Sequence, residues 1–263
     1  MDLSESPSLE HSSNRHPWEV SRLRFVASLV DRYVALDRPE VRVFDVGCGD
    51  AYVARELTAR NPTLQVEGVD PALPVEKHGS RLTGRIRLWR ELPGLEPGDS
   101  KARAVLMLDV LEHIEDDLAA LRALAASPAL DPDCILIVTV PAHQALFCSH
   151  DRLLGHYRRY SRKRLRSTLE QNGFSVLEEG GLYFSGFILR CIRAFLEQES
   201  LIPPLRETEV STWDGGERAS RFIAAVLSIE ITVLRGLAGI GIRFPGSSCY
   251  AVARKNPEWN ESR

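Results

Sequence analysis

Short apolar segments that alternate with helical segments constrain the fold of this chain more than any other sequence feature. The apolar segments are rich in β-branched and aliphatic residues, and they lie at 41–46, 64–69, 102–108 and 134–140. Helix-forming segments stand between them at 54–60 and 115–127, and both stop beside a proline. This alternation is typical of a mostly parallel sheet that helices cover on both faces. We therefore expect an α/β fold.

The remaining predicted elements extend the same alternation. They are a first helix, a weaker strand, a helix that Ser161 caps, a later strand and a last strand, at 16–33, 85–89, 161–171, 174–180 and 247–254. In such sheets, ligands bind outside the carboxyl ends of the strands. The polar residues that carry chemistry are expected there, at 45–50, 70, 109–113 and 141–160.

Composition places the chain among globular proteins of a reducing compartment. The 263 residues are 44% hydrophobic, and a formal net charge of -3 disfavours a generic nucleic-acid binder. Five cysteines are scattered without a C-x-x-C pair, and the N-terminus lacks the pattern of a signal peptide. We expect a cytoplasmic protein with a disordered segment at 1–15, one domain at 16–254 and a tail at 255–263.

The glycine loop VFDVGCGDAY, residues 43–52, is the strongest local signal. It predicts a strand, a tight turn at Gly47 and Gly49, and a helix whose first N–H groups are free for a ligand. A dinucleotide fingerprint would need glycine three residues after Gly49, where this chain has Tyr52. Asp70 ends the next strand, where an acid can accept both hydroxyls of a ribose, and Asp45 could receive a ligand ammonium.

Three motifs in order carry a family resemblance. With DVGCGDA (45–51), Asp70 and LMLDVLEHI (106–114), the chain over about 40–180 resembles the class I S-adenosylmethionine (SAM) dependent methyltransferases. The resemblance implies a Rossmann-like, doubly wound, mostly parallel seven-stranded sheet, with an antiparallel last strand and a helical insertion at about 184–245 before it. It also implies a SAM site formed by Asp45, Gly47, Gly49, Asp70 and Asp109. The family's third glycine is Ala51 here, which is small enough to preserve binding.

A possible metal site follows from the segment DVLEHIEDD. If a helix begins near Asp109, then Asp109, Glu112 and His113 share one face. Ubiquinone-pathway O-methyltransferases and small-RNA 2′-O-methyltransferases carry E-x-x-E-H here, with a later histidine, and this motif is associated with a divalent metal. The resemblance to these two branches implies a Mg-like ion at Asp109, Glu112, His113 and His156. The alternative is that these residues shape the pocket without a metal.

The polar loop at 141–160 supplies candidates for catalysis and acceptor binding. An oxygen nucleophile usually needs a base, and His143, His156, or His150 with its neighbour Asp151 could serve. Arg158 and Arg159 could hold a phosphate or carboxylate beside Tyr157, which favours an anionic acceptor. RNA would also use such a basic patch, but the acidic balance disfavours it.

Two apolar segments, 182–196 and 222–242, lie in the insertion. We weigh a substrate lid or dimer face, a helix on the inner surface of a membrane, and a true membrane span, which Glu230 and Arg235 disfavour. The function expected is methyl transfer to a hydroxyl of a small or lipid-linked acceptor. N- or C-methylation and a non-catalytic module that binds membranes or partners are the alternatives. The oligomeric state stays open.

Overall fold

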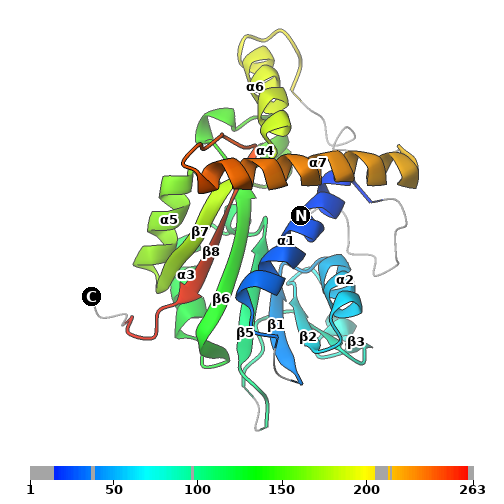
Figure 1. Cartoon of the computed structure of the whole chain (residues 1–263), viewed down its shortest axis with the longest axis vertical. Coiled ribbons are helices and arrows are strands. Elements are labelled where there is room, and N and C mark those ends of the chain that lie inside the picture. The colour runs from blue at the N-terminus through cyan, green and yellow to red at the C-terminus, as the bar shows by residue number, and fades with distance from the viewer. Residues whose placement is uncertain (1–14, 37–38, 96–97, 205–212, 214, 260–263) are drawn as a thin grey trace.

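A computed structural model describes residues 15–36, 39–95, 98–204, 213 and 215–259, which form one sheet flanked by helices (Figure 1). The eight strands lie in the order β3-β4-β2-β1-β5-β6-β8-β7. Their bounds are β1 Val41–Val46, β2 Leu64–Val69, β3 Arg81–Thr83, β4 Ile86–Trp89, β5 Ala102–Leu108, β6 Leu130–Pro141, β7 Phe174–Leu182 and β8 Ser248–Lys255. The expected segment 1–15, apart from Arg15, and tail residues 260–263 lie outside the described residues.

The helices fill the expected gaps between strands. The α-helices are α1 Pro17–Tyr33, α2 Tyr52–Arg60, α3 Asp117–Ala126, α4 Ser149–Leu153, α5 Arg162–Gln171, α6 Phe184–Gln198 and α7 Gly216–Gly239. Three short 3-10 turns are η1 Val75–Lys77, η2 Leu111–His113 and η3 Gln144–Leu146. The Ser161 hydroxyl caps α5, as predicted, by accepting a hydrogen bond from the Arg164 N–H.

The sheet confirms the expected fold class and corrects one detail. The strands β4, β2, β1, β5 and β6 run parallel, and β8 is antiparallel to both β6 and β7. The prediction of seven strands was one short, because β3 pairs antiparallel with β4 at one edge. This strand has three residues, none of them buried, so it has no apolar run that a sequence pattern could detect.

Helices bury both faces of the sheet, as the continuous apolar segments predicted. On one face, Val41 and Val43 of β1 belong to a core formed with α1, α2 and part of α7. On the other face, Phe44 belongs to a second core with α3 and α5. Successive residues of β1 thus enter different cores, which is how a strand is buried from both sides.

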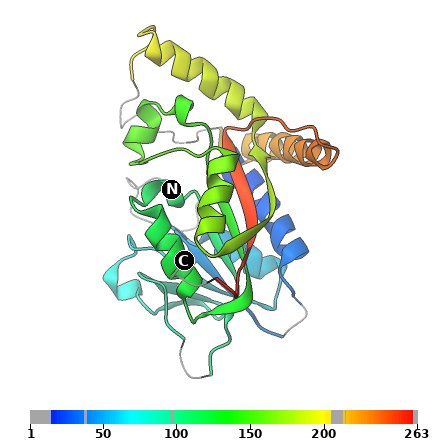
Figure 2. The same cartoon turned by 90° about the vertical axis from the view of Figure 1, so that its left-hand side faces the viewer.

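The helical insertion leaves and re-enters the sheet at the carboxyl edge. Leu182 at the end of β7 and Pro141 at the end of β6 are both in register with Ser248, the first residue of β8. The helices α6 and α7 therefore arise beside the carboxyl ends of the parallel strands. Figure 1 shows α7 lying across this end of the molecule, and Figure 2 shows α6 projecting away from the sheet.

One described helix, α7, is long and apolar enough to cross a membrane by length and composition alone. Its most apolar window has a mean hydropathy of 1.7, and only 11% of that window is buried. A buried core helix would pass the same test of composition, but it would be covered by the rest of the protein. The low burial makes the exposed side of α7 the feature that needs an explanation.

Candidate active site

The glycine loop forms the sharp turn that its sequence predicts. Gly47, Gly49 and Ala51 have φ values of +73°, +53° and +61°. Glycine adopts this left-handed region without strain, which accounts for the first two positions. Ala51, where the resembling family has its third glycine, adopts the same conformation and is fully buried at the start of α2. A side chain on Gly47 would also approach Val110 to 2.5 Å.

Asp70 is buried at the end of β2 and holds the loop in place. One carboxylate oxygen accepts the Gly49 N–H at 3.0 Å, and the other accepts the Ala72 N–H at 2.9 Å. A carboxylate has about four lone-pair positions, so each oxygen can still accept a hydroxyl. Asp70 therefore both shapes the turn and presents acceptors toward the place where a ribose is expected.

Asp45 carries an unsatisfied oxygen beside this turn. It is buried, and its Oδ2 has no hydrogen-bond partner among the described residues. Burial raises the pKa of Asp45 to about 7, Arg22 opposes the rise, and Asp70 adds to it. A buried carboxylate without a partner is costly, and a ligand ammonium would relieve that cost. The Gly49, Asp70 and Asp45 arrangement thus fits a ligand with ribose hydroxyls and an ammonium group.

The expectation that a helix begins near Asp109 was wrong, and Asp109 does not share a helix face with Glu112 and His113. Its φ is +56°, and the chain then enters the short turn η2 rather than an α-helix. Its carboxylate pairs with Arg22 and accepts the Thr139 hydroxyl at 2.9 Å. Burial alone would raise the pKa of Asp109, but Arg22 and Thr139 hold it below its ordinary value.

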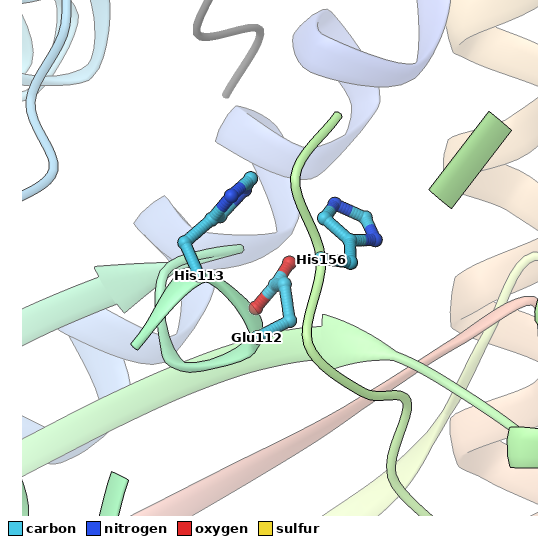
Figure 3. Close-up of side chains that lie close together, drawn as sticks. All are labelled: Glu112, His113 and His156. Atoms are coloured by element: carbon cyan, nitrogen blue, oxygen red, sulfur yellow. The ribbon is translucent and has the colours of Figure 1, made fainter. Parts of the chain in front are cut away.

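Glu112, His113 and His156 come together at the end of β5 (Figure 3). One potential ligand atom of each lies within 4.8 Å of the other two. The Glu112 oxygens and both ring nitrogens of His113 have no hydrogen-bond partner among the described residues. Burial and the nearby Asp109 raise the pKa of Glu112 well above its usual range, and burial lowers that of His113 to about 4. Three of the four predicted metal ligands are therefore adjacent, and Asp109 is engaged elsewhere.

Asp151 supports His156 rather than His150. Its Oδ1 lies 2.9 Å from Nδ1 of His156 and accepts Nε of Arg159 at 2.7 Å, while its Oδ2 accepts the Cys148 N–H at 3.0 Å. These contacts hold the pKa of the buried Asp151 well below its usual range, against the effect of burial. With Nδ1 of His156 bound to this carboxylate, its Nε2 is the nitrogen left for a ligand or a proton.

The other two histidines predicted as bases lie in different surroundings. Burial and then Arg190 lower the pKa of His150 to about 4. His143 has a φ of +63°, and its ring packs 5.0 Å from that of Phe187 on α6. Burial followed by Arg159 lowers its pKa. Of the loop histidines, His156 alone belongs to the cluster with Glu112 and His113.

Two arginines predicted to bind an acceptor already have partners. Arg158 pairs with Asp117 at 2.7 Å, and the buried Arg159 pairs with Asp151. Tyr157 is exposed, and its N–H donates to the Glu112 carbonyl at 2.8 Å, which ties the loop to the cluster. Sequence reasoning missed Arg190, whose guanidinium lies 3.9 Å from Cys148 Sγ and forms no ion pair among the described residues.

A comparison of the sequence with family models decides the family. A model described as a methyltransferase domain matches residues 18–179, which is more than half of the chain. The chain belongs to the methyltransferase domain family. The match is to the general domain and does not confirm the ubiquinone-pathway branch that the histidine motif suggested. No curated protein matches the chain significantly.

Solved structures support the fold of this methyltransferase. The [4+2]-cyclase SpnF matches with a TM-score of 0.52 at 19% identity, covering 94% of this chain and 84% of that one. A putative sarcosine dimethylglycine methyltransferase from Galdieria sulphuraria matches with 0.56 at 14% identity, covering 98% and 95%. Phosphoethanolamine N-methyltransferase 2 of Haemonchus contortus, in complex with SAM, gives 0.51 at 16% identity, covering 88% of this chain and 52% of that one.

Family and geometry agree on the reaction class. The protein is a SAM-dependent methyltransferase, a transferase of one-carbon groups. Gly47, Gly49, Asp45 and Asp70 would hold the cofactor, which supplies an electrophilic methyl group. What the chain adds is alignment, since well-oriented reactants can gain about 7–11 kcal/mol of barrier reduction. The match to a general methyltransferase domain does not fix the acceptor.

Proposed function

We propose that this methyltransferase transfers the methyl group to a hydroxyl oxygen of a small or lipid-linked acceptor that carries negative charge. The observation behind this proposal is the cluster of Glu112, His113 and His156, with Asp151 behind His156. A hydroxyl is a weak nucleophile until its proton is removed, whereas a neutral amine attacks directly. A buried group of bases at the carboxyl ends of the strands could remove the proton of such a hydroxyl.

We further propose that the cluster holds a divalent cation. Its orphaned, buried atoms are one carboxylate and imidazole nitrogens, and a cation would satisfy them together. Two imidazoles and one carboxylate suit Mn²⁺ or Zn²⁺ better than Mg²⁺, which prefers oxygen ligands. Such an ion would lower the pKa of an acceptor hydroxyl. Without an ion, Nε2 of His156 would act as the base, with Asp151 stabilising its charged form.

Arg190 is the candidate for recognition of the acceptor's negative charge, in place of Arg158 and Arg159. Burial and the neighbouring Arg159 lower its pKa, so an anion beside it would be favourable. It lies near enough to His150 and Asp151 for its charge to interact with both side chains. An arginine that is free of ion pairs can hold a carboxylate or phosphate bidentately.

Metal binding is tested by calorimetric titration of chelator-treated protein with Mn²⁺, Zn²⁺ and Mg²⁺. Saturable binding that Glu112→Gln and His156→Gln each weaken at least tenfold is expected. His78→Gln serves as the matched control, because His78 is exposed and remote in sequence from the loop. Equal binding by all three variants would contradict a metal at this cluster, and the base role of His156 would then remain.

The acceptor atom is tested with SAM carrying a labelled methyl group and matched pairs of amphiphiles that differ only in a hydroxyl or an amine. Labelling of the hydroxyl members is expected, with a higher KM in Arg190→Gln for anionic members only. Arg193→Gln is the control, because Arg193 already pairs with Glu197 at 2.8 Å. Labelling confined to amines would overturn the oxygen assignment.

A further inference from the structure

We propose that the outer sides of α6 and α7 rest in the plane of a lipid bilayer surface. This apolar face consists of Ile188, Leu189, Ile192 and Phe195 on α6, of Phe222, Val226, Ile229 and Val233 on α7, and of Ile240 just past the end of α7. Methyl transfer does not require such a face. Large apolar side chains that are exposed in such number mark contact with an apolar partner.

On α7 the exposed apolar residues form one stripe. Phe222, Val226, Ile229 and Val233 follow one another at intervals of four, three and four residues, so they share one side of the helix. Their exposed fractions are 72%, 50%, 65% and 53%. Ile240, one residue past the helix end, continues the stripe at 73%. From Phe222 to Ile240 the stripe therefore extends about 27 Å at 1.5 Å per residue.

The opposite side of α7 is fixed to the protein. Ser220, Ala224 and Ile231 are its buried residues, and the Ser220 hydroxyl donates to the Arg15 carbonyl just before α1. Arg235 donates twice to one oxygen of Glu178 on β7, at 2.8 and 3.0 Å. These contacts prevent the helix from turning its stripe inward. The exposure of the stripe is thus built into the fold.

The helix α6 adds a second apolar strip at the same edge. None of its residues is fully buried, and Leu189, Ile192 and Phe195 are more than half exposed. Its other side carries Phe187 against His143, and Glu197 accepts the Ser149 hydroxyl at 2.8 Å. The loop that forms the candidate active site is therefore attached to one side of α6, and the apolar strip lies on the other.

Charge and topology favour a bilayer over other partners. Exposed arginines flank the α7 stripe, with Arg218 and Arg221 at one end and Arg243 at the other. Arg221 pairs with Glu217 at 3.5 Å and Arg243 with Glu179 at 3.7 Å, but these side chains remain exposed and could also meet anionic headgroups. A span is disfavoured, because the chain must return to β8 at Ser248 and α7 would have to leave α1. A helix with one anchored side and one apolar side is suited to lie in the membrane plane.

A consequence follows that rests on the proposed function. The insertion joins the sheet at Leu182 and Ser248, beside the end of β6, so the apolar face borders the edge that carries the active site. A bilayer on this face would present amphiphilic acceptors next to Arg190 and the cluster. The acceptor class is then a membrane amphiphile with an anionic, hydroxylated headgroup.

The test is flotation of the full chain with vesicles of phosphatidylcholine alone or with 30% phosphatidylglycerol. We expect binding to both, stronger to the anionic vesicles, and at least a tenfold loss of partitioning in the Leu189→Asp/Ile229→Asp variant. Val75→Asp is the matched control, since Val75 is 70% exposed on η1 and lies outside the apolar face. It should float like the unaltered chain.

The experiment distinguishes failure of the membrane-binding proposal from failure of the proposed methyl transfer. Calorimetric binding of S-adenosylhomocysteine reports a folded cofactor site in every variant, independent of any acceptor. No flotation of a chain that binds this ligand would overturn the membrane proposal. A dimer that dissociates in Leu189→Asp/Ile229→Asp, seen by light scattering, would also overturn it and assign the face to a second copy.

Discussion

At the scale of single residues, two buried carboxylates differ from the other acids around the candidate site. Asp45 and Glu112 both have oxygens without hydrogen-bond partners among the described residues, and burial raises the pKa of each. Neighbouring acids are satisfied by the chain itself, as Asp109 is by Arg22 and Thr139. Each unsatisfied acid therefore identifies one candidate site. Asp45 belongs to the site for the cofactor ammonium, and Glu112 belongs to the site for a cation or proton.

Cofactor affinity should depend on the protonation of Asp45. A carboxyl with a pKa of about 7 is mostly protonated at pH 6 and mostly ionised at pH 8. Because a ligand ammonium favours the ionised form, S-adenosylhomocysteine should bind about tenfold more tightly at pH 8 than at pH 6. Calorimetry across this range measures the change. Asp45→Asn should remove it, and methylthioadenosine, which lacks the ammonium, should not show it. A pH slope that survives in Asp45→Asn would contradict this role.

Asp151 should be a strong determinant of stability. Asp151→Asn removes the charge that neutralises the buried Arg159, and breaking a buried pair in this way typically costs about 3–5 kcal/mol. Urea unfolding at pH 7 measures the loss, with the exposed Asp133→Asn as control. Because the folded pKa of Asp151 is lowered, its contribution is present at neutral pH and disappears only in acid. A loss no larger than that of the control would contradict the pairing.

At the scale of elements, the regular segments and the glycine turn were predictable, but the turn at Asp109 was not. Strands β1, β2 and β5 coincide with apolar runs, because they are buried in the middle of the sheet. Strand β6 contains the predicted run at 134–140 but begins earlier, at Leu130, through polar residues that a search for apolar runs does not detect. Helical periodicity did not reveal this turn at Asp109, because Asp109 has a positive φ and its carboxylate contacts Arg22 and Thr139, which lie far away in sequence. Adjacency in sequence suggested His150 as the partner of Asp151, but the carboxylate contacts His156 instead.

Glu178 on β7 should act as the fastening point of α7. Its carboxylate accepts hydrogen bonds from Tyr33 of α1 and Tyr250 of β8, each at 2.7 Å, as well as from Arg235 of α7. Glu178→Gln should cost about 1.5–3 kcal/mol at pH 7 because these are bonds to a charged acceptor. Chemical denaturation measures it against Glu170→Gln, whose side chain is exposed.

The pH dependence gives that experiment its second readout. Burial opposes ionisation, but the tyrosines and Arg235 lower the pKa of Glu178 below its ordinary value. The stabilisation is therefore complete above the ordinary range of a glutamate and is lost as the pH falls through the lowered pKa. The gap between Glu178→Gln and the unaltered chain should close in acid. A gap independent of pH would indicate lost packing instead of lost charge.

At the scale of the whole molecule, cofactor binding should stabilise the fold through one loop. A ligand at 100 times its Kd adds about 2.7 kcal/mol to the free energy of unfolding. S-adenosylhomocysteine at that concentration should raise the Tm of the intact chain, and Asp70→Ala should abolish the rise, since Asp70 holds both the loop and the expected ribose. Thermal unfolding with and without ligand measures this. An equal rise in Asp70→Ala would place the ligand elsewhere.

The register of the last strands places the residues for cofactor binding and the helical insertion in separate parts of the chain. Leu182 and Ser248 stand opposite each other, so everything between them is a single excursion from one point of the sheet. The proposed cofactor residues, from Asp45 to Asp70, all precede that point in the chain. Mutations, insertions or exchanges within the excursion can therefore alter what is methylated, and on which surface, while the residues that hold the methyl donor keep their sequence. Related proteins can therefore evolve toward new acceptors while they keep the residues that bind the methyl donor.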